Sequence, residues 1–271
     1  MLSASQIDQW LEEDIGHHDV TNDVAGETTG RLIAKEDGVA TGIDAAAAVF
    51  EHLDVATELR VDDSDRIEAG DVVLETSGPA RATLRAERVA VNLAGHASGV
   101  ATKTRAAVDR AAKVADDVRI AGTRKTTPGL RGVEKRAVAA GGGDTHRLDL
   151  SHMVMIKENH IAEMGLETAV ETFRERASFA TKIEVEAEST AQARRAAEAG
   201  ADIVLLDNMT PDKTRAAVDT LSEADTDVLS EASGGITIDD VTDYAATGVD
   251  IISMGSLTHS APSLDFSFRT G

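Results

Sequence analysis

The chain has 271 residues, and its 48 acidic side chains against 27 Lys and Arg give a formal net charge of −21. Phosphate backbones need neutralising cations, so this acidic excess argues against nucleic-acid binding. The sequence has no cysteine, no long apolar run and no secretory pattern at its start, which excludes disulfides and thiolate zinc sites and predicts a cytoplasmic protein without a membrane span.

The first hundred residues predict an α/β domain of their own. Two stretches have the apolar spacing of short helices, 5–13 and 45–53. Short apolar alternations bounded by Gly and Asp predict strands at 29–34, 39–43, 57–61 and 80–84. Helical periodicity then runs from 87 to about 115. We therefore assign residues 1–101 to an N-terminal domain that a long helix joins to the rest of the chain.

From residue 118 onward, short apolar runs alternate with helical segments. The apolar runs predict strands at 118–122, 154–156, 182–185, 203–206, 228–232 and 251–254. The segments between them predict helices at 133–140, 166–178, 190–199, 211–223 and 238–247. Strands that alternate with helices form parallel sheets. Because only about six strands are visible, we expect residues 102–271 to form an open, incomplete parallel α/β barrel whose last residues can pack back on the N-terminal domain.

Each predicted strand ends in polar or glycine residues. In chain order these are Thr123-Arg124, Lys157, Glu186, Asp207, Ser233-Gly234-Gly235 and Gly255-Ser256. The carboxyl ends of the strands are where α/β barrels build their active sites. We therefore expect the active site at this edge of the sheet.

Positive charge is concentrated in one part of this acidic chain. Five cationic side chains lie within 34 residues, namely Arg124, Lys125, His146, Arg147 and Lys157. Because arginine can bind a carboxylate through two parallel hydrogen bonds, this cationic cluster predicts a small polyanionic ligand such as a dicarboxylate. The alternative is that these side chains form ordinary surface salt bridges.

Acidic side chains end two of the strands. Glu186 ends one and Asp207 ends the next, and strand alternation places Glu184 on the same side as Glu186. Carboxylates that point into a barrel need a partner or a metal ion, and oxygen ligands suit Mg²⁺. Alternatively, Glu184 pairs with Lys182 or with one of the clustered cations.

Two glycine turns follow the last two strands. Ser233-Gly234-Gly235 opens a helix, and Gly255-Ser256 repeats the arrangement one unit later. Such turns offer backbone N–H groups to a phosphate, and the phosphate sites of α/β barrels lie after the last two strands. The sequence therefore predicts a ligand that carries a phosphate, although helix-entry turns also use glycine for its conformational freedom alone.

The acidic excess also bears on the working conditions of the protein. Carboxylates repel one another in dilute buffer, and salt screens that repulsion. We infer a protein adapted to concentrated salt, in which hydrated carboxylates keep the chain dissolved. The alternative is an ordinary acidic protein.

Taken together, these motifs resemble the quinolinate phosphoribosyltransferase family. The resemblance runs over nearly the whole chain. It is carried by residues 37–39, 87–92, 98–101, 123–160, 183–186, 206–208, 231–236 and 249–260. The chain departs from the family pattern at His18, Thr145 and Glu158, and none of these differences removes a cation from the cluster.

The resemblance implies a fold and a reaction. The fold is an N-terminal α/β sandwich followed by an open α/β barrel, assembled as a homodimer. The reaction joins quinolinate to phosphoribosyl pyrophosphate in the presence of Mg²⁺ and gives nicotinate mononucleotide, pyrophosphate and CO₂, a step of de novo NAD biosynthesis.

The resemblance also implies roles for individual residues. The cationic cluster would surround the quinolinate carboxylates and the pyrophosphate, with Lys125 among the catalytic residues. Glu186 and Asp207 would lie near the ribose, stabilise its developing positive charge and hold Mg²⁺ through water or substrate. Arg88 would enter the site across the dimer interface. The binders of the 5′-phosphate would be Ser233, Gly234, Gly235 and Gly255.

Three other functions remain open from the residues. A phosphoribosyltransferase for a monocarboxylate such as nicotinate is the first, although one carboxylate does not require five cations. A Schiff-base aldolase with Lys157 or Lys182 as nucleophile is the second. The third is a small-anion-binding or regulatory dimer that retains the site without turnover.

Overall fold

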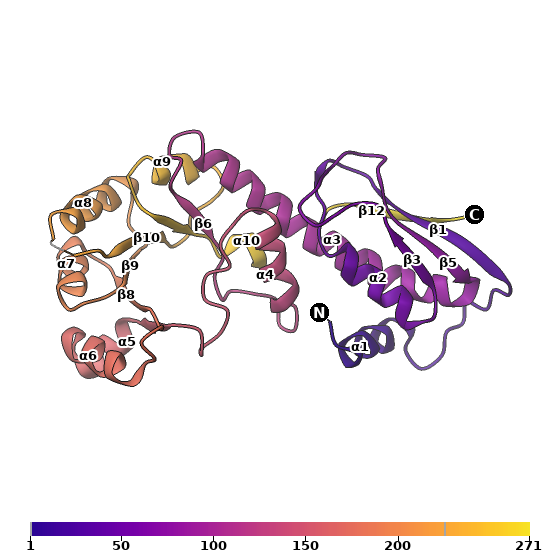
Figure 1. Ribbon diagram of the computed structural model, residues 1–271, viewed down its shortest axis with the longest axis horizontal. Coiled ribbons are helices and arrows are strands. Elements are labelled where there is room, and N and C mark those ends of the chain that lie inside the picture. The colour runs from indigo at the N-terminus through magenta and orange to yellow at the C-terminus, as the bar shows by residue number, and fades with distance from the viewer. Residues whose placement is uncertain (1, 225) are drawn as a thin grey trace. The chain divides into compact units, whose positions relative to one another are not determined.

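The computed structural model describes residues 2–224 and 226–271, which form two compact units (Figure 1). The first unit contains residues 2–105, 132–142 and 261–271. The second unit contains residues 106–131, 143–224 and 226–260. Within the described residues we find no helix with both the length and the apolar character needed to cross a lipid bilayer.

A four-stranded antiparallel sheet organises the first unit. Its strands follow the order β12 (Phe266–Thr270), β1 (Glu27–Ala34), β5 (Val72–Pro79) and β3 (Ala56–Leu59). A separate two-stranded ladder joins β2 (Gly38–Val39) to β4 (Arg66–Ile67). The helices are α1 (Ala4–Ile15), α2 (Ile43–His52) and most of α3 (Ala80–Ala111) and α4 (Arg131–Ala140).

The core of the first unit lies between this sheet and α2. Leu32 of β1 and Leu74 of β5 are opposite each other in register, and both are fully buried. Phe50 of α2 is also fully buried, and its ring stacks on Phe268 of β12 at a centroid distance of 5.2 Å. The burial of alternate residues along β1 gives the sheet one apolar face, which a helix covers. The predicted α/β sandwich is confirmed.

Two local predictions in this unit are wrong. Residues 80–84 are not a strand but the first turns of α3, in which the buried residues Ala80, Thr83 and Ala86 recur every three residues along one helix face. The short alternation of apolar residues in this stretch led to the strand prediction. The true strand β5, just before it, was missed because it contains polar residues and a glycine. The predicted strand 39–43 stops at Val39, and Gly42 with φ of +69° precedes α2.

The unit boundaries differ from the predicted division after residue 101. Helix α3 continues without a break through that point, and the division between the two units falls after residue 105 of the chain. Two later segments join the first unit because they pack closely on α3. A Cβ atom at Gly99 would lie 1.9 Å from the carbonyl oxygen of Pro262, and one at Gly141 would lie 2.5 Å from that of Ala101. Strand β12, which pairs with β1, belongs to the segment 261–271.

The second unit is built on a parallel sheet. In spatial order its strands are β6 (Arg119–Ala121), β11 (Ile251–Ser253), β10 (Leu229–Ser233), β9 (Ile203–Asp207), β8 (Ile183–Ala187) and β7 (Val154–Ile156). The helices wholly within this unit are α5 (Glu158–Met164), α6 (Leu166–Arg176), α7 (Thr190–Glu198), α8 (Pro211–Ser222), α9 (Val241–Ala245) and α10 (Ser256–His259). All six predicted strands are confirmed.

This sheet is an open barrel rather than a closed one. In the described part of the chain, β6 and β7 are its two edges and do not pair with each other. Helices α7 and α8 pack beside the strands, and Leu166, Val185 and Leu206 are among the buried side chains between the layers. Because all six strands are parallel, their carboxyl ends lie along one edge of the sheet. The predicted active-site residues of this unit follow that edge.

Candidate active site

The first cation-bearing loop follows β6. The Lys125 carbonyl accepts a hydrogen bond of 2.6 Å from the hydroxyl of Thr258, which is itself buried. The Lys125 backbone N–H donates to Oγ1 of Thr123 at 3.1 Å. These two bonds fix the backbone while the Lys125 side chain stays exposed. The Nε atom of Arg124 is buried and has no hydrogen-bond partner among the described residues, so its N–H is free to bind a ligand.

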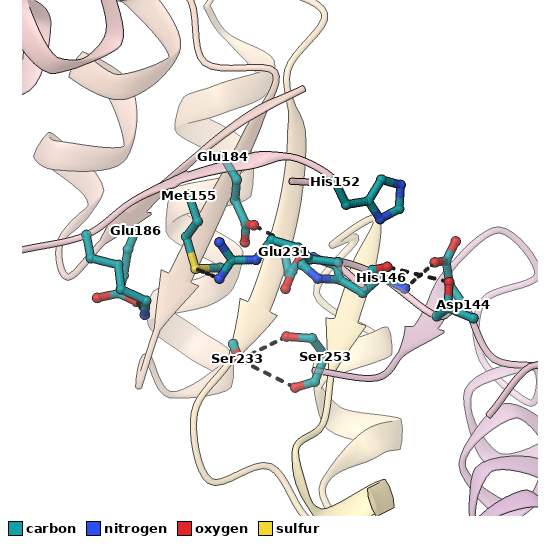
Figure 2. Close-up of polar contacts among 12 residues, drawn as sticks. Asp144, His146, His152, Met155, Glu184, Glu186, Glu231, Ser233 and Ser253 are labelled. Carbon is teal, nitrogen blue, oxygen red and sulfur yellow. Dashed lines mark hydrogen bonds and ion pairs between the residues drawn. The ribbon is translucent and has the colours of Figure 1, made fainter. Parts of the chain in front are cut away.

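The second pair of cations follows a single β-bridge. Asp144 pairs in parallel with Ala121 of β6, so His146 and Arg147 emerge on the carboxyl side of the sheet although they precede β7 in sequence. His146 has φ of +51°, and its backbone N–H donates to Oδ1 of Asp144 at 2.6 Å (Figure 2). An unusual backbone conformation at a polar side chain is characteristic of functional sites.

Two buried glutamates lie beside this pair. Glu231 of β10 accepts a hydrogen bond of 3.0 Å from Nε2 of His146, and Oε2 of Glu184 lies 3.8 Å from the same nitrogen (Figure 2). Both glutamate side chains are fully buried. Burial, and secondly repulsion by Glu231, raises the pKa of Glu184 to about 8. Burial also lowers the pKa of Arg147 from its ordinary value, against the attraction of both glutamates.

A third group joins Lys157 to the acids that end β8 and β9. The Lys157 ammonium donates to Oε2 of Glu186. Burial, and secondly the negative charge of Glu186, raises the pKa of Asp207. Lys157 and Lys125 both act on Asp207 in the opposite direction, which places two cations and two carboxylates in one electrostatic network. Two adjacent carboxylates at a strand edge are a suitable oxygen-donor set for Mg²⁺.

The glycine turn after β10 packs against the end of β9. Ser233 is in register with Asp207, and the N–H of Asn208 donates to the Ser233 carbonyl at 2.9 Å. Gly234 and Gly235 have φ of +99° and +63°, a region that glycine enters without strain. Their positive φ values form the kind of backbone turn that presents N–H groups to an anion.

Gly255 belongs to the turn after β11 and lies beside the first cationic loop. A Cβ atom at this position would lie 2.9 Å from Cδ of Lys125 and 3.3 Å from Oγ1 of Thr123. The missing side chain therefore allows the turn and the Lys125 stem to approach closely. This contact connects the predicted phosphate site to the cationic cluster.

The two glycines of the β10 turn give a matched stability test. Gly234→Ala should destabilise the protein by about 2–3 kcal/mol, because it combines a strained φ with a Cβ only 2.4 Å from Oδ1 of Asn208. Gly235→Ala should cost about 1 kcal/mol, since its Cβ would meet no described atom within 4 Å and only the φ is unfavourable. Urea unfolding of both variants measures the difference; equal losses would contradict the predicted clash.

The structure joins most of the predicted site residues through direct contacts or charge interactions. Those in the second unit are Arg124, Lys125, His146, Arg147, Lys157, Glu186, Asp207, Ser233, Gly234, Gly235 and Gly255. Arg88 belongs to the first unit, where its side chain is 58% exposed and lies 3.5 Å from Glu87. Glu184 does not pair with Lys182, because Lys182 contacts Asp202 at 3.3 Å instead.

Sequence reasoning missed Glu231 as a site residue. The available signal was a charged residue in the middle of a short predicted strand, where both of its neighbours, Ser230 and Ala232, are buried. A carboxylate in such a strand is costly unless it has a partner, and here the partner is His146. The three side chains His146, Glu184 and Glu231 place one donor atom each within 4.8 Å of one another.

Comparisons with known proteins match both parts of the chain to one family. Residues 19–98 match the N-terminal domain of quinolinate phosphoribosyl transferase, and residues 100–269 match its C-terminal domain. A probable nicotinate-nucleotide pyrophosphorylase [carboxylating] from Methanothermobacter thermautotrophicus is 44% identical over 270 residues, which cover 97% of each chain. The human nicotinate-nucleotide pyrophosphorylase [carboxylating] is 40% identical, covering 98% of this chain and 91% of the relative.

Solved structures show the same fold over the full length. The crystal structure of NadC from Streptococcus pyogenes matches with a TM-score of 0.90 and 39% identity, covering 99% of this chain and 97% of that one. The nicotinate-nucleotide pyrophosphorylase from Francisella tularensis matches with a TM-score of 0.91 and 31% identity. Both domain matches and both kinds of relative lead to one assignment: the chain belongs to the quinolinate phosphoribosyltransferase family of enzymes.

Proposed function

We propose that the protein transfers the phosphoribosyl group of phosphoribosyl pyrophosphate to quinolinate, with loss of CO₂, and so forms nicotinate mononucleotide. The observation that carries this proposal is the collection of cations at one strand edge of an otherwise acidic chain. Arg147 and Arg124 influence each other electrostatically, and Lys157 and Lys125 both act on Asp207. A dicarboxylate and a pyrophosphate together carry enough negative charge to explain such a cluster.

The arrangement supports a substitution at the ribose. The pyridine nitrogen of quinolinate attacks the anomeric carbon while the bond to pyrophosphate breaks, and positive charge develops on the ribose. The carboxylates of Glu186 and Asp207 are placed to stabilise that charge, and Lys125 and Lys157 to accompany the departing pyrophosphate. The 2-carboxylate then leaves as CO₂, its bonding electrons pass into the pyridinium ring, and a proton replaces it on the carbon.

Mg²⁺ is part of this proposal. Glu186 and Asp207 would hold it, directly or through water and substrate, and the repulsion between their carboxylates is the feature that a cation would relieve. When bound, the ion would neutralise charge on the pyrophosphate. We expect no turnover after chelation of divalent cations and recovery when Mg²⁺ is returned.

The competing activities fit the contacts less well. Lys157 donates to Glu186, which assigns it a carboxylate partner instead of a carbonyl substrate. Lys182 precedes β8 and contacts Asp202, so it lies at the amino end of the strand, away from the edge that carries the site. A nicotinate-specific transferase would leave part of the cationic cluster without a counter-charge.

The direct test measures pyrophosphate and nicotinate mononucleotide from purified protein, phosphoribosyl pyrophosphate and Mg²⁺. Parallel reactions contain quinolinate or nicotinate. Product from quinolinate alone supports the proposal, and product from nicotinate alone contradicts it. Binding of quinolinate without any turnover would favour the anion-binding dimer, and borohydride trapping of a carbonyl substrate would favour the aldolase.

The proposal includes a homodimer in which Arg88 completes the site of the partner subunit. Its support is the exposed position of Arg88 on α3, where Glu87 lies 3.5 Å from the guanidinium, and the resemblance to the family. Molar mass in solution tests the dimer: a monomer that turns over quinolinate at the wild-type rate would contradict it. Cytoplasmic location stays a prediction from composition.

Salt dependence follows from the net charge of −21. We predict that unfolding temperature rises as KCl increases from dilute buffer to molar concentration, because salt screens repulsion among the surface carboxylates. Thermal unfolding followed by circular dichroism at several KCl concentrations measures this. A constant or falling unfolding temperature would identify an ordinary acidic protein.

A further inference from the structure

Glu184 and Glu231 have no part in the reaction described above, yet they are the least exposed charged groups at the site. Both side chains are fully buried within the second unit. Neither oxygen of Glu184 accepts a hydrogen bond from the described residues, and the same holds for Oε1 of Glu231. Buried carboxylates with so few hydrogen bonds are expensive in free energy, which calls for a reason beyond packing.

The contacts show what these carboxylates act on. Glu231 accepts the Nε2–H of His146 at 3.0 Å, and Glu184 lies 3.8 Å from the same nitrogen. Arg147 is 8% exposed and feels the attraction of both glutamates. Its Nη2 contacts the sulfur of Met155 at 3.0 Å, and Met155 is the register neighbour of Glu184 (Figure 2). Two members of the cationic cluster, His146 and Arg147, therefore interact with two buried glutamates.

Among the described residues, Nη2 of Arg147 contacts only a weak hydrogen-bond acceptor, and its Nε has no hydrogen-bond partner. The acceptor is a thioether sulfur, which accepts poorly, and the Nε atom is buried. Glu231 thus attracts the guanidinium without a hydrogen bond to its Nε, which leaves that N–H for a substrate carboxylate. A ring nitrogen of His146 is held more tightly, since its hydrogen bond to Glu231 fixes that nitrogen as a donor.

The same three side chains could be read as a metal site, because His146, Glu184 and Glu231 offer donor atoms within 4.8 Å of one another. Charge balance favours the other interpretation. Arg147 already acts electrostatically on both glutamates, and Lys157 adds further positive charge near Glu184. A divalent cation would have to enter against these neighbours.

We propose that Glu231 is a positioning residue that fixes the His146 ring for quinolinate. The inference rests on the proposed function, since it takes His146 as one of the cations that bind the dicarboxylate. It predicts that Glu231 governs quinolinate binding and leaves the phosphoribosyl pyrophosphate side of the site unaffected.

The test compares Glu231→Gln with the wild-type enzyme in steady-state kinetics. We expect KM for quinolinate to rise about 10-fold, in line with the weakening of one charge-assisted hydrogen bond, while kcat and KM for phosphoribosyl pyrophosphate change less than about twofold. Calorimetric titration with quinolinate alone should show the same loss of affinity. In a His146→Ala background, Glu231→Gln should add no further loss, because the two residues act as one unit.

A second buried pair supplies the matched control. Glu134 of α4 is fully buried, and its Oε1 lies 2.9 Å from Nε2 of His96 within the first unit. Glu134→Gln should lower stability to a similar degree and leave KM for quinolinate unchanged. A general loss of packing would instead lower the active fraction in both variants without changing KM.

Distinct results would overturn the inference. An unchanged or lower KM for quinolinate in Glu231→Gln would mean that the carboxylate only repels the dianion. Additive losses in the double variant would mean that Glu231 does not act through His146. Stoichiometric Zn²⁺ binding to the wild type that Glu231→Gln abolishes would establish the metal site in its place. Absence of wild-type turnover would refute the proposed function itself, which keeps the two failures separate.

Discussion

Arg147→Ala should raise KM for quinolinate by about 100-fold or more. Arg147 as a whole is 8% exposed, so a carboxylate bound to its guanidinium is shielded from water and forms strong charge-assisted hydrogen bonds. Two such bonds at about 1.5–3 kcal/mol each account for that loss. Removing Arg147 also leaves the buried Glu231 with less counter-charge, so unfolding free energy should fall by about 3 kcal/mol.

Arg147→Lys separates charge from geometry. Lysine keeps the positive charge but loses the planar fork that binds both oxygens of a carboxylate. We expect most of the stability to return while KM for quinolinate stays about 10-fold high. Steady-state kinetics and urea unfolding of both variants measure the two effects. If Arg147→Ala bound quinolinate as the wild type does, the assignment of this side chain to the dicarboxylate would be wrong.

Lys125→Ala should lower kcat by about 100-fold and change KM for quinolinate little. Lys125 is exposed at the strand edge, acts electrostatically on Asp207 and lies against Gly255 of the predicted phosphate turn. A single cation aimed at charge that develops in the transition state contributes about this factor. Because pyrophosphate acquires that charge only as its bond to ribose breaks, the effect belongs to turnover and not to quinolinate binding.

Lys182→Ala is the control for Lys125→Ala. Lys182 pairs with Asp202 at the amino end of β8, and its loss should leave kcat within about twofold of the wild type. Single-turnover kinetics with rapid quenching would show whether the slow step in Lys125→Ala is bond cleavage or product release. An unchanged single-turnover rate would remove Lys125 from the catalytic residues.

The two units differ in how well the sequence predicted them. In the second unit several strands are short and largely apolar, such as Ile203–Asp207, and a helix of regular period follows that strand. A strand buried on both faces has few ways to be misread. In the first unit, β5 carries Glu75, Ser77 and Gly78 and was missed, while the start of α3 imitated a strand over five residues.

The site shows a similar division. The cations and glycines were predictable because they are unusual for this acidic chain or for the ends of buried strands. The function of Asp144 could not be predicted, because a single bridge to Ala121 leaves no periodic pattern in the sequence. This bridge nevertheless brings His146 and Arg147 to the carboxyl side of the sheet. The position of Met155 beside Glu184 depends on the pairing of β7 with β8, which local sequence does not encode.

By itself, the sequence determined the parallel strand–helix order, the cationic cluster and the family, since these depend on local spacing and residue type. Only the tertiary structure decided which charges meet. Glu231, Glu184 and His146 come from three segments as far as 85 positions apart, and their contact follows from the order of β8, β9 and β10 in the sheet. Electrostatic interaction depends on distance in space and on exclusion of water, and both are properties of the folded chain.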